Sequence, residues 1–217
     1  MIRKFAKDTA LLLIDVQKGV HDLAHWGGPG GRMNNPECEN HLRSLLTKFR
    51  QAGLPIAFTR HDSLEPDSPL KFSLHGGAQL AGLETEPGDI IVEKSVNSGF
   101  IGTDLDLQLR RAGISRLVIA GYFTNFCVET TTRMAGNMGF DCYLAHDACA
   151  TCNRIDLDGT DHDPELVHAL SVANMHGEFC TAITSAQALG LLSKDAAHLT
   201  RAQGNEATSQ KPELRIA

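Results

Sequence analysis

Residues 116–146, RLVIAGYFTNFCVETTTRMAGNMGFDCYLAH, hold the clearest structural pattern in the sequence. The continuous apolar run at 117–120 predicts a strand buried on both faces. A helix is expected over 128–138, because a glycine follows at the position that commonly ends a helix, and a second strand is expected over 140–145. This order of strand, turn, helix and strand is typical of an α/β fold. The turn contains a cysteine, Cys127, just before the expected helix.

Cys127 is the candidate reactive residue of this stretch. A cysteine at a helix N-terminus lies among unpaired backbone N–H groups and near the positive end of the helix dipole. Both features favour the thiolate over the thiol, and the same N–H groups can bind an oxyanion. The sequence therefore predicts a nucleophile elbow with sulfur as the nucleophile. The alternative is a buried and inert cysteine, which is the commoner state of a free thiol.

The composition is that of an ordinary globular protein. The chain has 217 residues, 42% hydrophobic and 21% charged, and its formal net charge of −6 argues against nucleic acid or an anionic membrane as partner. No apolar stretch approaches the roughly 18 residues of a membrane-spanning helix. The N-terminal apolar run, residues 10–14, is too short for a signal peptide. Because the six cysteines are dispersed, we expect reduced thiols and a cytoplasmic protein.

Apolar runs and helical periods alternate along most of the chain. Further strands are expected at 9–16, 54–59, 90–93 and 179–183, and further helices at 36–52, 104–112, 164–176 and 185–192. Such alternation predicts a parallel sheet with helices on both faces. We expect a three-layer, doubly wound α/β fold with six parallel strands in the order 3-2-1-4-5-6. Residues 1–193 are expected to form a single domain, and 194–217 a polar tail.

Two long segments without a clear period, 18–35 and 60–89, interrupt this alternation. Long loops in compact domains are usually functional. We therefore expect both segments to line a pocket and to set substrate specificity. The sequence GGPGG in the first segment lacks the Lys-Ser/Thr that follows a phosphate-binding loop, so a phosphate site is not expected there.

Three reactive residues follow three of the predicted strands. Asp15 comes after the first strand, Lys94 after the third and Cys127 after the fourth. Ligands of open parallel sheets bind at the carboxyl ends of the strands, so these side chains are expected around one crevice. There the carboxylate can take the thiol proton, the ammonium can stabilise the thiolate, and the thiolate can attack an electrophilic carbon. Taken singly, Asp15 could be a helix cap or a structural ion pair, and Lys94 a solvated strand end.

The sequences around these residues resemble one known group of enzymes. DVQ after the first strand, EKSVNSGF after the third and GYFTNFCVETTTRMA at the fourth are similar to the isochorismatase-like cysteine hydrolases, over residues 8–192. That superfamily includes nicotinamidases, N-carbamoylsarcosine amidohydrolases and ureidoacrylate amidohydrolases. The resemblance implies a catalytic triad of Asp15, Lys94 and Cys127. It also implies a cis peptide between Tyr122 and Phe123, with the N–H groups of Phe123 and Cys127 forming an oxyanion hole.

The resemblance leads to an expected activity and an expected assembly. We expect a hydrolase that cleaves the C–N bond of a small amide, ureido or carbamoyl compound through a thioester. The alternative within the superfamily is hydrolysis of the isochorismate vinyl ether, which members without the cysteine perform, so the presence of Cys127 argues against it. Self-association as a homodimer or homotetramer is expected, because members of this fold are commonly dimers or tetramers.

No metal or other cofactor is expected. Nicotinamidases have an Asp-x-His metal motif after the second strand, but this chain has Arg60-His61-Asp62 there, and its next histidine is His75. Val20 stands where many members have phenylalanine. Loop histidines are usually only solvated, and that is the expectation for His21, His25, His61, His75 and His162.

The candidate substrate-binding residues come from the same motifs and from nearby aromatic residues. They are Gln17, Trp26, Asn97, Phe100 and Thr124. Phe126 could join the aromatic residues in a pocket for a planar substrate, or all of them could be core or lid packing. Arg60 or Arg133 could pair with a substrate carboxylate, and either could equally be a surface charge.

Two other readings use different residues. Cys149 and Cys152 form a Cys-x-x-Cys sequence that could be a redox pair, or a zinc site together with His162 and His168. The spacing fits no standard zinc pattern, and a ten-residue segment separates the pair from the next expected helix, where a redox motif would lie at the helix N-terminus. The GGPGG loop could also belong to a binding module without catalysis.

Overall fold

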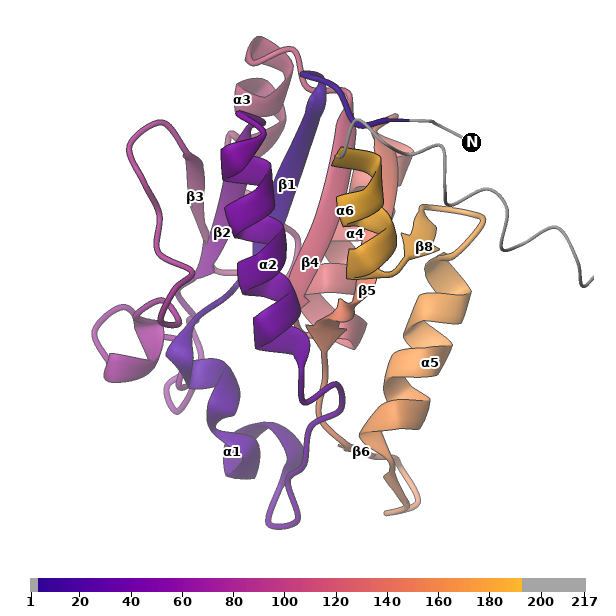
Figure 1. Ribbon diagram of the computed structural model, residues 1–217. Coiled ribbons are helices and arrows are strands. Elements are labelled where there is room, and N and C mark those ends of the chain that lie inside the picture. Colours follow the sequence, from indigo (N-terminus) through magenta and orange to yellow (C-terminus); the bar gives the residue numbers. More distant parts are fainter. Residues whose placement is uncertain (1–3, 193–217) are drawn as a thin grey trace, which may run out of the picture.

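One six-stranded parallel sheet forms the centre of the computed structural model, which describes residues 4–192 (Figure 1). Its strand order is β3-β2-β1-β4-β5-β8, which confirms the predicted order 3-2-1-4-5-6. The sixth strand is labelled β8 because two short strands intervene in the chain. The six strands are β1 (Thr9–Ile14), β2 (Ile56–His61), β3 (Ile90–Lys94), β4 (Arg116–Tyr122), β5 (Asp141–Ala150) and β8 (Thr181–Ile183).

The central strands are buried on both faces, as their unbroken apolar sequences predict. All six residues of β1 are buried, and β1 pairs in parallel with β2 on one side and β4 on the other. A parallel sheet aligns the carboxyl ends of its strands at one edge. The segments that follow β1, β3 and β4 therefore meet at that edge, at the lower end of the sheet in Figure 1.

Helices cover both faces of the sheet (Figure 1). On one face, α2 packs on β1 and β5 and against α6; on the other, α3 lies by β3, α4 by β5, and α5 between α4 and β8. Leucines and one phenylalanine at helical spacing bury one side of α2. The helices are α1 (Leu23–Gly27), α2 (Cys38–Gln51), α3 (Leu105–Arg111), α4 (Glu129–Asn137), α5 (Pro164–Met175) and α6 (Ser185–Leu192).

The structure departs from the sequence prediction in its short elements. The first long loop contains a 3₁₀ turn, Lys18–His21, and the short helix α1. Strand β5 runs to Ala150 instead of ending at 145, and a two-stranded hairpin of β6 (Arg154–Ile155) and β7 (Asp161–His162) follows it. Two-residue strands are too short for an alternating pattern to show. The tail expected at 194–217 lies outside the described residues.

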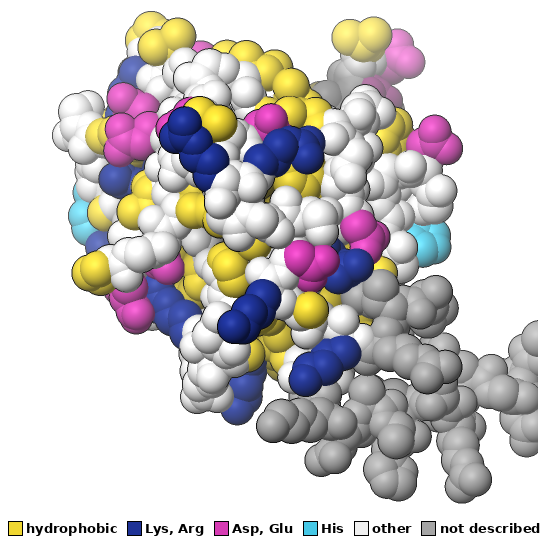
Figure 2. Space-filling view, turned by 90° about the horizontal axis from the view of Figure 1, so that it is seen from above, with side chains coloured by type: hydrophobic (Ala, Val, Ile, Leu, Met, Phe, Trp, Pro, Cys, Tyr) yellow, Lys and Arg dark blue, Asp and Glu magenta, His cyan; other side chains and the backbone are white. Residues whose placement is uncertain are grey.

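The opposite end of the molecule, at the amino ends of the strands, has a mixed surface. Figure 2 shows acidic, basic and hydrophobic side chains interspersed on it. Arg116 there contacts both Asp8 and Asp141. Among residues 4–192, no helix is long and apolar enough to cross a membrane. Self-association stays a prediction.

Candidate active site

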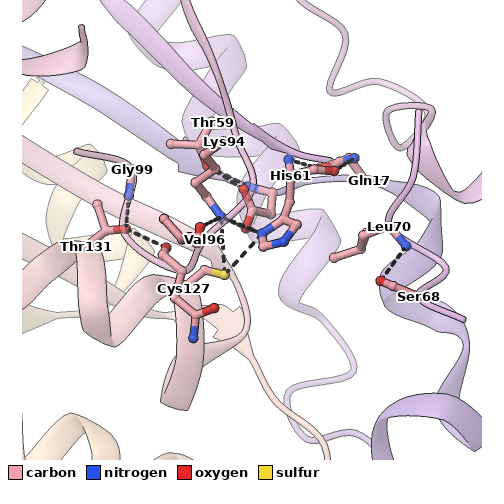
Figure 3. Close-up of polar contacts among 12 residues, drawn as sticks. Gln17, Thr59, His61, Ser68, Leu70, Lys94, Val96, Gly99, Cys127 and Thr131 are labelled. Carbon is pink, nitrogen blue, oxygen red and sulfur yellow. Dashed lines mark hydrogen bonds and ion pairs between the residues drawn. The ribbon is translucent and has the colours of Figure 1, made fainter. Parts of the chain in front are cut away.

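Asp15, Lys94 and Cys127 meet at the carboxyl edge of the sheet (Figure 3). The Lys94 Nζ atom lies 2.6 Å from Asp15 Oδ2 and 3.3 Å from Cys127 Sγ. The expectation that these three residues share one crevice agrees with this geometry. The alternative for Lys94, a solvated strand end, is wrong, because none of its side chain is exposed.

Asp15 is held in place by the neighbouring strand. Its φ of +50° is unusual for a residue other than glycine, and its backbone N–H donates to Thr59 at 3.2 Å. The Thr59 hydroxyl donates to Asp15 Oδ1 at 2.5 Å. Burial by itself raises the pKa of Asp15, but the Lys94 ammonium and nearby His61 outweigh burial and lower it to about 2. Asp15 is therefore an ionised carboxylate at neutral pH.

The side-chain amine of Lys94 contacts four hydrogen-bond partners. Besides Asp15 and the sulfur, its amine reaches His61 Nδ1 at 2.8 Å and the Val96 carbonyl oxygen at 3.2 Å. An ammonium has three hydrogens to donate, so four acceptors compete for them. A buried ammonium requires a counter-ion, and Asp15 supplies it.

The surroundings of Cys127 favour the neutral thiol over the thiolate. Burial raises its pKa, the Asp15 charge raises it further, and the Lys94 charge lowers it by less than these two together. Burial and the Asp15 charge therefore oppose the preference for thiolate that a helix N-terminus was expected to give. The Asp15 and Cys127 ligand atoms lie within 4.8 Å of each other, so the thiol has a carboxylate base close by.

The turn that carries Cys127 differs from the predicted helix start. It is a π-helical turn, Thr124–Val128, and α4 begins only at Glu129. The Tyr122–Phe123 peptide bond before the turn is cis. Gly121 has φ of +130°, and a Cβ there would lie 2.1 Å from the Ile14 carbonyl oxygen. Only glycine lets β4 approach β1 this closely.

His61 is the site residue that sequence reasoning missed. It was expected to be solvated, but it is buried at the end of β2 and lies 3.8 Å from Cys127 Sγ through its Nδ1 atom. Since Lys94 can only donate hydrogen bonds, Nδ1 accepts from it and the ring hydrogen is carried on Nε2. The signal available in the sequence was its place two residues after the predicted strand at 54–59, at the same edge of the sheet as Asp15.

Metal binding is disfavoured by the position of Lys94. Within residues 4–192, Asp15, His61 and Cys127 are the one group whose ligand atoms lie close enough together to bind a metal ion. The Lys94 ammonium already lies within 3.3 Å of an atom of each of the three. A cation among these atoms would face a positive charge at contact distance. The donor set therefore does not fit a metal ion while Lys94 is protonated.

A cavity of about 190 Å³ opens in front of the thiol. It is smaller than the roughly 300–1,000 Å³ of pockets for drug-sized ligands, which points to a small ligand. One wall is aromatic, with the Trp26 and Phe123 rings 4.8 Å apart. The lining residues are Asp15, Val20, Trp26, His61, Ser63, Glu65, Ser68, Leu70, Asn97, Tyr122, Phe123, Phe126 and Cys127. Both long loops expected to line a pocket contribute to it.

Two of the five candidate substrate-binding residues, Trp26 and Asn97, line this cavity, and three do not. Gln17 exchanges hydrogen bonds with the backbone of His61, at 2.7 and 3.0 Å. Phe100 stacks on Phe140 with ring centroids 5.9 Å apart. The Thr124 hydroxyl forms a 2.8 Å hydrogen bond with His168 Nδ1. Of these three side chains, Gln17 holds the backbone of a lining residue, His61, and the other two contact residues outside the lining.

The two arginines considered for a substrate carboxylate are engaged elsewhere. Arg60 lies over the Phe72 ring and contacts Glu93, while Arg133 binds Glu129. Neither lines the cavity.

The Cys-x-x-Cys readings are not supported by the structure. Cys149 and Cys152 are both buried free thiols, and burial raises the pKa of Cys152 to about 11 and that of Cys149 well above its usual range. His162 bonds to Asp156. Within the described chain these residues form no metal-binding group.

Comparisons with known proteins agree with this fold. Residues 9–187 match the isochorismatase domain family. The isochorismatase family protein YrdC of Bacillus subtilis is 37% identical over 82% of this chain and 92% of its own length. Nicotinamidase 3 of Arabidopsis thaliana is 30% identical over 68% of this chain and 76% of its own. The crystal structure of an isochorismatase-family hydrolase from Chromobacterium violaceum is 42% identical over 87% of this chain and 96% of that one, with a TM-score of 0.80. The chain therefore belongs to the isochorismatase family of hydrolases.

Proposed function

We propose that this hydrolase cleaves the C–N bond of a small amide or ureide through a thioester on Cys127. The observation that carries the proposal is the contact of one thiol with a buried carboxylate–ammonium pair at the floor of a small cavity. Such a set can move a proton and stabilise charge around a sulfur nucleophile. A nicotinamidase among the relatives supports the choice of an amide C–N bond.

In the first half of the reaction, the Asp15 carboxylate takes the Cys127 proton as the sulfur attacks the substrate carbonyl. The low pKa of Asp15 and the raised pKa of Cys127 make this transfer unfavourable at rest. We infer that it proceeds together with attack, when the negative charge moves from sulfur to the carbonyl oxygen. The backbone N–H groups of Phe123 and Cys127 are the proposed donors to that oxygen. Removing one such donor typically costs about 10²–10³ in rate.

In the second half, protonated Asp15 gives its proton to the departing nitrogen, and ammonia or an amine leaves. Water, activated by the same carboxylate, then hydrolyses the thioester and restores the thiol. Lys94 remains positively charged throughout and holds Asp15 in the position that both proton transfers require.

His61 has a proposed binding role in the same reaction. Its Nδ1 atom accepts from Lys94, so its Nε2–H is a neutral donor on a side chain that lines the cavity. We infer that this N–H orients the substrate or the hydrolytic water. Gln17 fixes the histidine by bonding its backbone on both sides.

The test is a screen for released ammonia or amine across small amides, ureido acids and carbamoyl compounds. We expect the wild-type enzyme to turn over at least one of these compounds, and we expect this turnover to be lost in Cys127→Ala. Cys152→Ala is the matched control, because Cys152 is buried but is not part of this site. Turnover that survives in Cys127→Ala would contradict the proposal.

A further inference from the structure

We propose that the cavity selects substrates without a carboxylate, namely neutral or positively charged amides and ureides, and that Glu65 sets this preference. The inference rests on the proposed function, since it names the class of substrate for the same site. It follows from the charges of the side chains that face the ligand.

The cavity lining carries acidic side chains and no fixed cation. Its ionisable members are Asp15, His61, Glu65, Tyr122 and Cys127. Among the residues that the structure describes, no lysine or arginine lines it. Enzymes that bind a substrate carboxylate commonly do so with an arginine or a lysine. A substrate carboxylate in this cavity would therefore find no lysine or arginine side chain in the cavity lining to pair with.

The charge of Lys94 is already balanced by Asp15. The two side chains are 2.6 Å apart, and both are almost completely buried. Their charges cancel at a distance, because a close ion pair acts as a dipole instead of a net charge. With the Cys127 thiol neutral, Glu65 is then the uncompensated charge of the lining.

Two cations, Lys71 and Arg154, contact residues of the cavity wall. Lys71 donates to the Ser63 carbonyl oxygen at 2.8 Å. Arg154 lies 4.9 Å above the Phe126 ring and donates to the Trp26 carbonyl oxygen at 3.3 Å. Both cations are thus positioned by contacts with wall residues, and neither of them lines the cavity.

Glu65, by contrast, is available to a ligand. It is exposed while lining the cavity, which places it at the open side. Its carboxylate has no ion-pair or hydrogen-bond partner within residues 4–192. The segment that carries it is held by backbone bonds: Ser63 donates to the Leu70 carbonyl oxygen at 2.7 Å, and Leu70 donates to the Ser68 hydroxyl at 3.2 Å. Ser68 and Leu70 lie near His61 in Figure 3.

These observations have an energetic consequence. A substrate carboxylate would be desolvated without an ion-pair partner and would lie in the same cavity as the Glu65 charge, and both effects weaken binding. A substrate ammonium or amide N–H would gain an acceptor there. The walls therefore discriminate by charge as well as by size.

The first test compares three amides of matched length: 4-aminobutanamide, pentanamide and succinamate. Ammonia release should give a kcat/KM for succinamate about tenfold or more below that of pentanamide, with 4-aminobutanamide at least equal to pentanamide. Glu65→Gln should bring the three values closer together. The proposal is overturned if succinamate is the best substrate of the three. Release of no ammonia from any small amide or ureide would instead contradict the proposed function.

The second test needs no turnover. Iodoacetamide and iodoacetate are nearly equal in size and differ in charge, and peptide mass spectrometry can follow alkylation of Cys127 by each. The measured quantity is the rate with iodoacetamide divided by the rate with iodoacetate, normalised to the same quotient for free N-acetylcysteine. This normalised quotient should be about 10 or more in the wild type. It should be at least about threefold lower in Glu65→Gln.

The matched control for the alkylation test is Glu178→Gln, which removes an exposed carboxylate between α5 and β8. It should leave the ratio at the wild-type value. An unbiased ratio in the wild type, or a ratio that Glu65→Gln does not change, overturns the proposal whether or not an amide substrate has been found.

Discussion

Cys127 and Cys149 are both buried cysteines close to β4, but they differ in their charged neighbours and in their access to the cavity. Cys149 lies in β5 opposite Gly121, is completely buried, and donates to the Ala145 carbonyl oxygen at 3.4 Å. Cys127 lies in the turn after β4, faces a cavity, and has Lys94 at 3.3 Å. Burial is the largest cause of a raised pKa in both thiols.

The comparison shows that burial and a raised pKa do not distinguish a nucleophile from an inert thiol. The difference lies in three neighbours of Cys127: an ionised carboxylate that can accept its proton, an ammonium that can stabilise its charge, and a cavity that admits a substrate. Cys149 has none of these among the described residues. The predictions below remove the thiol, remove or protonate Asp15, or replace His61 in the cavity wall.

The largest effect is expected from removing the thiols one at a time. Cys127→Ala should lower kcat by about 10⁴-fold or more, because no other group can form the thioester. Cys149→Ala should keep activity within about twofold and lose about 1 kcal/mol of stability from the small cavity it leaves. Steady-state ammonia release and urea unfolding measure the two effects. Equal loss of activity in both variants would remove the distinction between the thiols.

The next largest effect comes from the base. Asp15→Asn should lower kcat by about 10²–10⁴-fold, the usual contribution of a general base. It should also destabilise the fold by about 3 kcal/mol, because it leaves the buried Lys94 charge without its counter-ion.

The double variant Asp15→Asn/Lys94→Met separates these two roles of Asp15. It should recover most of the stability and none of the activity, because no charge is then left unpaired while the base is still missing. Urea unfolding measures the stability of the double variant, and ammonia release measures its activity. Recovery of activity in the double variant would show that the carboxylate is not the base.

The pKa of Asp15 predicts a pH dependence of stability. Folding lowers this pKa from 3.8 to about 2, so Asp15 stabilises the fold by about 2 kcal/mol above the unfolded-state pKa, and this contribution is lost as the pH falls from about 4 to about 2. Urea unfolding of the wild type and Asp15→Asn at pH 6 and at pH 2.5 should show the difference between them shrinking at low pH. A constant difference would mean that Asp15 is not the ionised partner of Lys94.

A smaller effect is expected at His61. His61→Leu removes the Nε2–H donor but leaves Asp15, Lys94 and the thiol in place, so kcat/KM should fall about tenfold, the cost of one hydrogen bond to a substrate. His162→Leu is the matched control, because His162 is a histidine of the β7 strand that does not line the cavity. Unchanged kinetics in His61→Leu would make this histidine a structural residue only.

The parallel sheet and the meeting of Asp15, Lys94 and Cys127 at its carboxyl edge could be predicted from the sequence for one physical reason. Unbroken apolar runs identify strands that are buried on both faces, and parallel strands bring their carboxyl ends to one edge. The polar residue that follows each run is therefore placed by the topology alone. The two-residue strands β6 and β7 and the π-helical turn have no such periodic signal.

The direction in which a single side chain points could not be predicted in the same way. Whether Gln17, Phe100 or Thr124 faces the cavity depends on side-chain partners far away in the sequence, such as the His61 backbone, Phe140 and His168. The charge state of Cys127 likewise depends on its burial and on Asp15, which is 112 positions earlier (127 − 15) in the chain. A local pattern, such as a cysteine before a helix, does not contain this information.

The central claim is that Cys127 forms a covalent intermediate and the other cysteines do not. The most direct measurement is peptide mass spectrometry of the enzyme quenched in acid during turnover of the slowest amide that it hydrolyses. The account predicts an added mass equal to the acyl group of that amide on the peptide containing Cys127, absent in Cys127→Ala. An acyl group on Cys149 or Cys152, or full activity in Cys127→Ser, would contradict it.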